Sequence, residues 1–182
     1  PAPPTRMLYA TAAWRYARGL AFIATGRRDE ATRELTALRA VRQRVPADRT
    51  LTFFFKMADM VRLAEETLAG EIAARGGDAG TAVTHLAEAV RLQDQHWFTE
   101  PPPWYYPVRQ SLGAVLQQAG RAAEAEAVYR EDLRRNPENG WSLFGLGQSL
   151  RAQGKTADAA AVDARFRRAW ARADVTLASS RL

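Results

Sequence analysis

The sequence predicts an all-α protein, and three observations support that fold class. Alanine, the strongest helix former, occupies 36 of the 182 positions. Apolar residues recur at helical spacing on both sides of a set of regularly spaced glycines. No stretch of strand length alternates between apolar and polar residues. Together these observations predict eight principal helices in four antiparallel pairs.

The glycines and alanines follow a spacing rule that occurs four times. A glycine is followed by a second glycine seven residues later and by an alanine five residues after that. The four sets are Gly19, Gly26 and Ala31; Gly70, Gly77 and Ala82; Gly113, Gly120 and Ala125; and Gly147, Gly154 and Ala159. Recurrence of one pattern at four places predicts four copies of a helix-turn-helix unit.

Each position in the rule has a physical reason. The first glycine lies inside a predicted helix, where it costs about 1 kcal/mol relative to alanine, so we expect another helix to approach closely there. The second glycine suits the left-handed conformation that ends a helix, after which Asp29 or Asp78 can cap the next one. The alanine allows the two helices of a pair to cross closely. Pro137 predicts the end of a helix.

This pattern resembles the tetratricopeptide repeat (TPR), a helix-turn-helix unit of about 34 residues that builds right-handed α-α superhelices, or solenoids. The resemblance implies a single domain over residues 1–182, with insertions at 46–62 and 97–105 and a frayed tail at 174–182. Alignment on the glycines places the four repeats at about 12–45, 63–96, 106–139 and 140–173.

The stretch from Trp104 to Trp141, with its flanks, is also similar to the C-terminal part of uncharacterised bacterial TPR-repeat proteins. Two positions depart from the family pattern, because Arg18 precedes the first glycine where leucine is usual and Asp163 stands where a large apolar residue is common. We expect the last helix to pack instead through Ala159, Val162, Phe166 and Ala169 or Trp170. The first insertion leads into a lengthened helix that is expected to pack through Met57, Met60, Val61, Ala64, Leu68 and Ile72.

The resemblance further implies a concave groove lined by the first helix of each repeat. The corresponding positions are aromatic at both ends of the chain and rich in amides between them, and aromatic and arginine side chains commonly anchor interfaces. The groove candidates are Tyr16, Glu71, Arg75, Gln110, Gln117, Trp141, Phe144, Gln148 and Arg151. The lysine and asparagine set with which some family members bind a peptide's terminal carboxylate is missing.

A second candidate site is the aromatic insertion, which Pro101 to Pro103 should make stiff. We expect Arg109 to pair with Glu100, and Trp104 to face Trp141 across a loop pocket. The loop pocket residues are therefore Glu100, Trp104 and Arg109. In the alternative interpretation, Trp141 and Phe144 pack against the insertion and fill the groove from within.

Signals for catalysis are few. The chain has two histidines and no cysteine, and it carries no phosphate-binding loop, nucleophile elbow or dinucleotide fingerprint. Asp94, His96 and Glu100 form a weak candidate for a metal site, because a three-ligand site needs convergent geometry. We therefore expect no enzyme activity, no cofactor and no metal.

The charge distribution bears on the class of partner. The net charge is +6, but residues 1–62 carry +7, residues 63–139 carry −5 and residues 140–182 carry +4. A nucleic-acid binder would present a continuous basic stripe, so nucleic acid is an unlikely partner. The excess of arginine over lysine is also what a GC-rich bacterial genome produces. No stretch approaches the roughly 18 uninterrupted apolar residues of a membrane span.

The sequence thus predicts a protein or peptide interaction scaffold of bacterial origin, with cytoplasm and periplasm both open. One alternative is a regulatory or substrate-binding domain of a larger bacterial enzyme, which a catalytic sequence before Pro1 would favour. A weaker alternative is nucleic-acid binding, favoured by an isoelectric point near 10.3.

Overall fold

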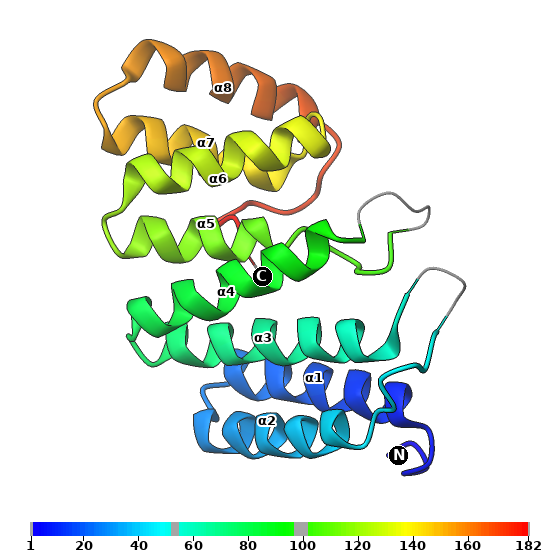
Figure 1. Cartoon of the computed structure of the whole chain (residues 1–182). Coiled ribbons are helices and arrows are strands. Elements are labelled where there is room, and N and C mark those ends of the chain that lie inside the picture. Colours follow the sequence, from blue (N-terminus) through cyan, green and yellow to red (C-terminus); the bar gives the residue numbers. More distant parts are fainter. Residues whose placement is uncertain (1, 52–54, 97–101, 182) are drawn as a thin grey trace. The chain divides into compact units, whose positions relative to one another are not determined.

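The computed structural model describes residues 2–51, 55–96 and 102–181, and its regular structure is helical (Figure 1). Within these residues the one β feature is an isolated bridge between Thr50 and Lys56. The helices are α1 (Leu8–Ala24), α2 (Arg28–Gln43), α3 (Met57–Arg75), α4 (Ala79–Asp94), α5 (Arg109–Gln118), α6 (Ala122–Arg135), α7 (Gly140–Ala152) and α8 (Thr156–Ala169). The all-α prediction is confirmed.

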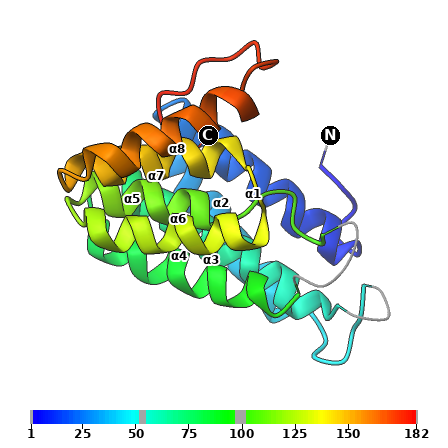
Figure 2. The same ribbon diagram turned by 90° about the horizontal axis from the view of Figure 1, so that it is seen from above.

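The chain divides into two compact units, Pro1–Tyr106 and Pro107–Leu182, which we call unit 1 and unit 2. Unit 1 contains α1 to α4, and α3 contacts each of the other three helices. Unit 2 contains α5 to α8, and α7 contacts each of the other three, with α8 lying along it (Figure 2). Each unit therefore has its third helix at its centre.

The turns within the helical pairs confirm the role predicted for the second glycine. All four of these glycines have a left-handed backbone, which an L residue with a Cβ adopts only with strain. Their φ angles are 75° at Gly26, 80° at Gly77, 74° at Gly120 and 72° at Gly154. Asp78 caps α4 as predicted, because its side chain accepts a hydrogen bond of 3.0 Å from the Thr81 backbone N–H.

Asp29 does not cap α2, so that prediction is wrong. The helix begins at Arg28, and the residue at the capping position is Arg27, whose side chain makes no capping hydrogen bond. Asp29 lies instead in the first turn, where a negative charge interacts favourably with the positive end of the helix dipole.

The first glycines lie at close contacts between helices, as predicted. In unit 1, a Cβ added at Gly19 would lie 2.6 Å from Leu68 Cδ2, and one added at Gly70 would lie 2.6 Å from Leu86 Cγ. In unit 2, a Cβ at Gly113 would collide with the ring of Tyr129. The alanines of the rule, Ala31, Ala82, Ala125 and Ala159, are at most 2% exposed.

Helix ends also follow local signals. The helix α6 ends at Arg135, two residues before Pro137, and Asn139 then caps α7 by accepting a 3.0 Å hydrogen bond from the Trp141 N–H. The lengthened helix of unit 1 is α3, which begins at Met57 and buries the apolar residues expected of it.

Ion pairs replace apolar packing at the two departures from the family pattern. Arg18 lies with Nη2 3.1 Å from Glu34 Oε1, and its guanidinium stacks 4.4 Å from the centre of the Trp14 ring. Asp163 accepts a hydrogen bond of 2.7 Å from Arg151. Both departures are therefore satisfied within their own helical pair.

The residues after α8 contradict the expectation of a frayed tail. Leu177 is 9% exposed and Ser180 is fully buried. The Trp170 indole N–H donates to the Val175 carbonyl at 2.8 Å, which directs the chain back from the end of α8. The segment then returns toward α5 (red in Figure 1).

Candidate functional site

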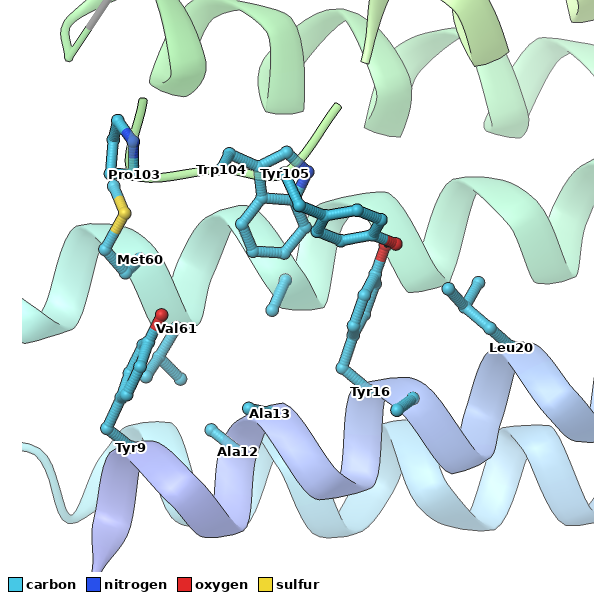
Figure 3. Close-up of a pocket in the computed structure, with 12 residues that line it drawn as sticks. Tyr9, Ala12, Ala13, Tyr16, Leu20, Met60, Val61, Pro103, Trp104 and Tyr105 are labelled. Carbon is cyan, nitrogen blue, oxygen red and sulfur yellow. The ribbon is translucent and has the colours of Figure 1, made fainter. Parts of the chain in front are cut away.

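Unit 1 contains a cavity of about 470 Å³ between α1, α3 and the non-helical residues 103–105 (Figure 3). We call it the unit 1 cavity. Its walls are formed by Tyr9, Ala12, Ala13, Tyr16, Ala17, Leu20, Met60, Val61, Ala64, Pro103, Trp104 and Tyr105. No charged side chain belongs to this set.

Small side chains on the helices create the space. Ala12, Ala13 and Ala17 follow α1 at helical spacing, and Ala64 faces them from α3. Ala13 and Ala17 are exposed, so the cavity is open to solvent along this part of α1.

The aromatic insertion closes the third side. The Tyr16 ring meets the Trp104 ring edge to face, with centroids 5.2 Å apart, and Figure 3 shows it rising from α1 toward Tyr105. The hydroxyl oxygens of Tyr16 and Tyr105 are 3.1 Å apart. The Gln93 amide of α4 donates to the Tyr106 carbonyl at 2.8 Å. These contacts hold residues 104–106 against the helices.

The polar groups of this wall are uncharged at neutral pH. Burial, reinforced by the neighbouring Tyr106 and Tyr105, raises the pKa of Tyr16 far above its ordinary value. Burial likewise raises the pKa of Tyr105. The Trp104 side chain is almost fully buried, and its indole N–H makes no hydrogen bond to any described residue. A cavity of this kind suits an apolar or aromatic group with little charge.

Of the groove candidates in unit 1, only Tyr16 lines the cavity. Glu71 is buried on α3, and Arg75 is exposed in the last turn of that helix. The helix α3 therefore contributes Met60, Val61 and Ala64 to the cavity, and the two charged candidates lie further along it.

In unit 2, the amides among the groove candidates join helices to one another. Gln110 on α5 donates to Asn139 Oδ1 at 3.1 Å. Gln117, also on α5, donates to the Gly145 carbonyl at 2.7 Å and to Ser149 Oγ at 2.9 Å, both on α7. Their side chains thus stabilise the packing of α5 on α7.

The aromatic candidates of unit 2 pack against α8. The Trp141 ring lies 5.7 Å from the Trp170 ring, and the Phe144 ring lies 5.6 Å from the Phe166 ring. All four side chains are half-buried. The remaining candidates are Gln148, which is half-buried on α7, and Arg151, which is exposed and pairs with Asp163.

The described residues of the predicted loop pocket belong to different units. Glu100 lies outside the described residues, as do Trp97 and Phe98. Trp104 lines the unit 1 cavity, and Arg109 begins α5 in unit 2, where it is 8% exposed. The pairing of Arg109 with Glu100 and the pocket facing Trp141 stay predictions.

Of the three candidate metal ligands, the structure describes Asp94 and His96. The His96 imidazole Nε2 lies 3.4 Å from Asp59 Oδ2, and its ring packs edge to face against Phe55. Among the described residues no three acidic or histidine side chains converge as a metal site would require, and Glu100 is outside that set. No helix in the described part of the chain is long and apolar enough to cross a membrane.

Of the site candidates named from the sequence, Tyr16 and Trp104 line the cavity. A usable signal was present on α1, where Ala13, Ala17 and Leu20 recur at a spacing of one helical turn on the face of Tyr16. The contact of residues 103–105 with α1 had no signal, because it joins positions almost ninety residues apart.

No protein-family model matches the chain, and comparison with curated proteins gives no match.

Proposed function

We propose that the chain is a non-catalytic module that binds a protein or peptide partner, and that its helical pairs are four TPR-like repeats of a right-handed superhelix. The observation that carries the proposal is the unit 1 cavity. Its volume of about 470 Å³ falls in the range of roughly 300–1,000 Å³ typical of ligand sites. Its helical walls are α1 and α3, which are the first helices of two pairs and would line a groove in that family.

The chemistry of the cavity favours an apolar or aromatic side chain as the bound group. Tyr16 and Trp104 supply a large apolar surface at its wall, and Tyr105 is 64% exposed beside them. Pockets with buried aromatic walls commonly hold the side chain that contributes most to an interface. We therefore place the partner's anchoring residue between α1 and residues 103–105.

The arginines of unit 1 argue against nucleic acid as the partner. Arg39 Nε and Arg42 Nε lie 3.0 Å and 2.6 Å from the two carboxylate oxygens of Glu65. Arg15 and Arg18 similarly share Glu34. These cations stabilise the packing of neighbouring helices, so the net charge of this region overstates what it offers to a phosphate backbone. If the chain is instead a regulatory or substrate-binding domain of a larger enzyme, the same cavity would bind a small apolar molecule.

A substitution that fills the cavity with a larger side chain tests the proposal. Peptides would be selected from a random display library with the intact chain, and their dissociation constants measured by isothermal titration. Ala13→Phe places a ring in the cavity from an exposed position, and should weaken binding at least about tenfold without loss of helix. Ala40→Phe is the matched control, because Ala40 is exposed on α2 and does not line the cavity.

Selected peptides should share an apolar or aromatic residue whose replacement by alanine also weakens binding at least about tenfold. The proposal is wrong if the selection gives no binder, or if Ala13→Phe and Ala40→Phe bind the selected peptides equally well.

A further inference from the structure

Residues 175–181 lie in unit 2 in the manner of a bound peptide. The segment has no helix, and its burial alternates, because Leu177 and Ser180 are buried while Val175, Thr176 and Ala178 are exposed. Two buried side chains three residues apart, separated by less buried residues, are typical of an extended ligand held by two anchors. A segment belonging to the core would bury most of its apolar residues.

Ser180, the second of these two anchors, lies in a site formed by α5, α6 and α7. Ser180 Oγ donates to the Gln110 backbone carbonyl at 3.2 Å and is hydrogen-bonded to the Tyr129 hydroxyl. Tyr129 projects from α6, and its ring end lies between Gly113 of α5 and Gly145 of α7. A Cβ added at Gly145 would lie 2.6 Å from the Tyr129 hydroxyl oxygen. Two glycines on separate helices thus allow the phenol to reach the segment.

The polar contacts of the site favour a hydroxyl-bearing side chain at the position of Ser180. The Tyr129 hydroxyl belongs to a fully buried side chain. The other acceptor it has among the described residues is Gln117 Oε1, which is 3.4 Å away and competes with Ser180 for the single hydroxyl proton. A buried hydroxyl that loses its partner costs free energy, so alanine at the second anchor should bind more weakly than serine. Arg181 adds a contact outside the anchor, with Nη2 3.3 Å from Gln118 Oε1 on α5.

We infer that the site formed by Tyr129, Gln110 and the two glycines is a second peptide-binding site, and that residues 175–181 are its displaceable internal ligand. The kind of partner it fits is an extended peptide with a leucine-like side chain three residues before a serine, followed by arginine. Such a partner binds only when the internal segment leaves. This inference is independent of the unit 1 cavity, because every residue it uses lies in unit 2.

The test uses a synthetic peptide with the sequence of residues 174–182, labelled with fluorescein at its N-terminus and followed by anisotropy. In the full chain, the double substitution Leu177→Asp and Ser180→Tyr removes both internal anchors. The peptide should bind this variant with one-to-one stoichiometry, and at least about tenfold more tightly than it binds the parent chain, whose site is occupied. A chain ending at Asp174 should bind it in the same way.

Matched peptide controls isolate the hydroxyl contact. A peptide with alanine in place of Ser180 should bind the double variant about tenfold more weakly, whereas alanine in place of Ser179 should have little effect. Among the described residues, the Ser179 hydroxyl is hydrogen-bonded to the backbone N–H of Arg181, which belongs to the same segment. Adding Tyr129→Phe to the double variant should reduce the preference for serine over alanine, because only the hydrogen bond to the Gln110 carbonyl remains.

The inference is overturned if the peptide fails to bind a folded double variant, or if the two alanine peptides bind equally. It is also overturned if both the double variant and the shortened chain lose their helical circular dichroism, since the segment would then be part of the core. None of these outcomes affects the peptide-selection test of the unit 1 cavity.

Discussion

In unit 1, the first helices α1 and α3 leave an open cavity of about 470 Å³, and alanines lie where larger side chains would fill it. In unit 2, the corresponding helices α5 and α7 are joined by Gln110 and Gln117, and residues 175–181 lie against α5. Small residues occur in both units but act differently. Exposed alanines in unit 1 leave room beside a helix, whereas buried glycines in unit 2 let one aromatic ring pass between two helices.

The comparison teaches that similar helical pairs can be completed by non-helical segments in two ways. Trp104 and Tyr105 form a wall of the unit 1 cavity and leave space beside it. Ser180 instead enters the unit 2 site and satisfies its buried hydroxyl. In the two proposals above, the first arrangement is open to a ligand and the second is occupied by an internal segment.

The largest expected effect comes from Gly113→Leu in unit 2, because the added side chain would occupy the space of the Tyr129 ring. Overpacking of a close helix contact typically costs about 1–3 kcal/mol, and here the obstacle is a fully buried ring. We expect a loss of about 3 kcal/mol, which corresponds to a fall of roughly 6–12 °C in the thermal midpoint by calorimetry. Ala125→Leu, also in the core of unit 2, should have a similar effect.

The control for this substitution is Arg121→Leu at the turn between α5 and α6. Arg121 is exposed, and its ion pair within the described part of the chain is with the exposed Glu124, so its replacement should leave the midpoint nearly unchanged. Equal shifts for Gly113→Leu and Arg121→Leu would contradict the close contact assigned to Gly113.

Tyr16→Phe in unit 1 should have a smaller effect on stability than Gly113→Leu. The substitution retains the ring that packs on Trp104 but removes the hydroxyl that meets Tyr105. We expect the free energy of unfolding to fall by about 0.5–1 kcal/mol in urea titrations, because the hydroxyl of the exposed Tyr105 can bind water instead.

Tyr9→Phe is the matched variant on another wall of the same cavity. The Tyr9 hydroxyl makes no hydrogen bond to a described residue, so its loss should change stability less than the loss of the Tyr16 hydroxyl. The reverse order would mean that the Tyr16–Tyr105 contact does not hold residues 104–106 in place.

The smallest expected effect depends on pH and concerns Glu126 of α6 in unit 2. Hydrogen bonds from Lys155 at 2.7 Å, and then from Arg130 and Gln153, lower the pKa of this carboxyl from 4.5 to about 2. Its ionised form is therefore favoured by folding, and this stabilisation is complete above pH 4.5 and is lost as the pH falls toward 2. Glu126→Gln should cost about 1 kcal/mol or less at pH 7 and almost nothing near pH 2.

Thermal midpoints of the parent chain and Glu126→Gln, measured between pH 2 and 7, test this prediction. The difference between the two should shrink as the pH is lowered. Glu124→Gln is the control, because its pair with Arg121 is exposed and should produce a smaller dependence. A constant difference across the pH range would show that Glu126 does not stabilise unit 2 through its charge.

Much of the fold could be predicted because its signals are local. The turn at Gly77 and the cap at Asp78 involve residues a few positions apart, and the apolar face of α3 follows from helical spacing alone. The prediction for Asp29 was wrong because the capping position is Arg27, two residues earlier, and local sequence signals place a helix boundary only to within one or two residues.

The sites were harder to predict because they depend on distant contacts. Tyr16 meets Tyr105 across 89 positions, and Ser180 meets Gln110 across 70. Neither pairing has a periodic signal in one sequence. Gly145 lies outside the spacing rule, so its part in admitting Tyr129 became visible only when α5, α6 and α7 were seen together.

The two kinds of glycine have different evolutionary consequences. A Cβ at Gly26, Gly77, Gly120 or Gly154 would meet nothing within 4 Å, so the constraint there is the left-handed backbone, which asparagine also tolerates. At Gly113 and Gly145 the constraint is space, and a change at either position would need a smaller residue at 129. Natural variants should therefore exchange the turn glycines one at a time for asparagine. The glycines around Tyr129 should change only together with that tyrosine.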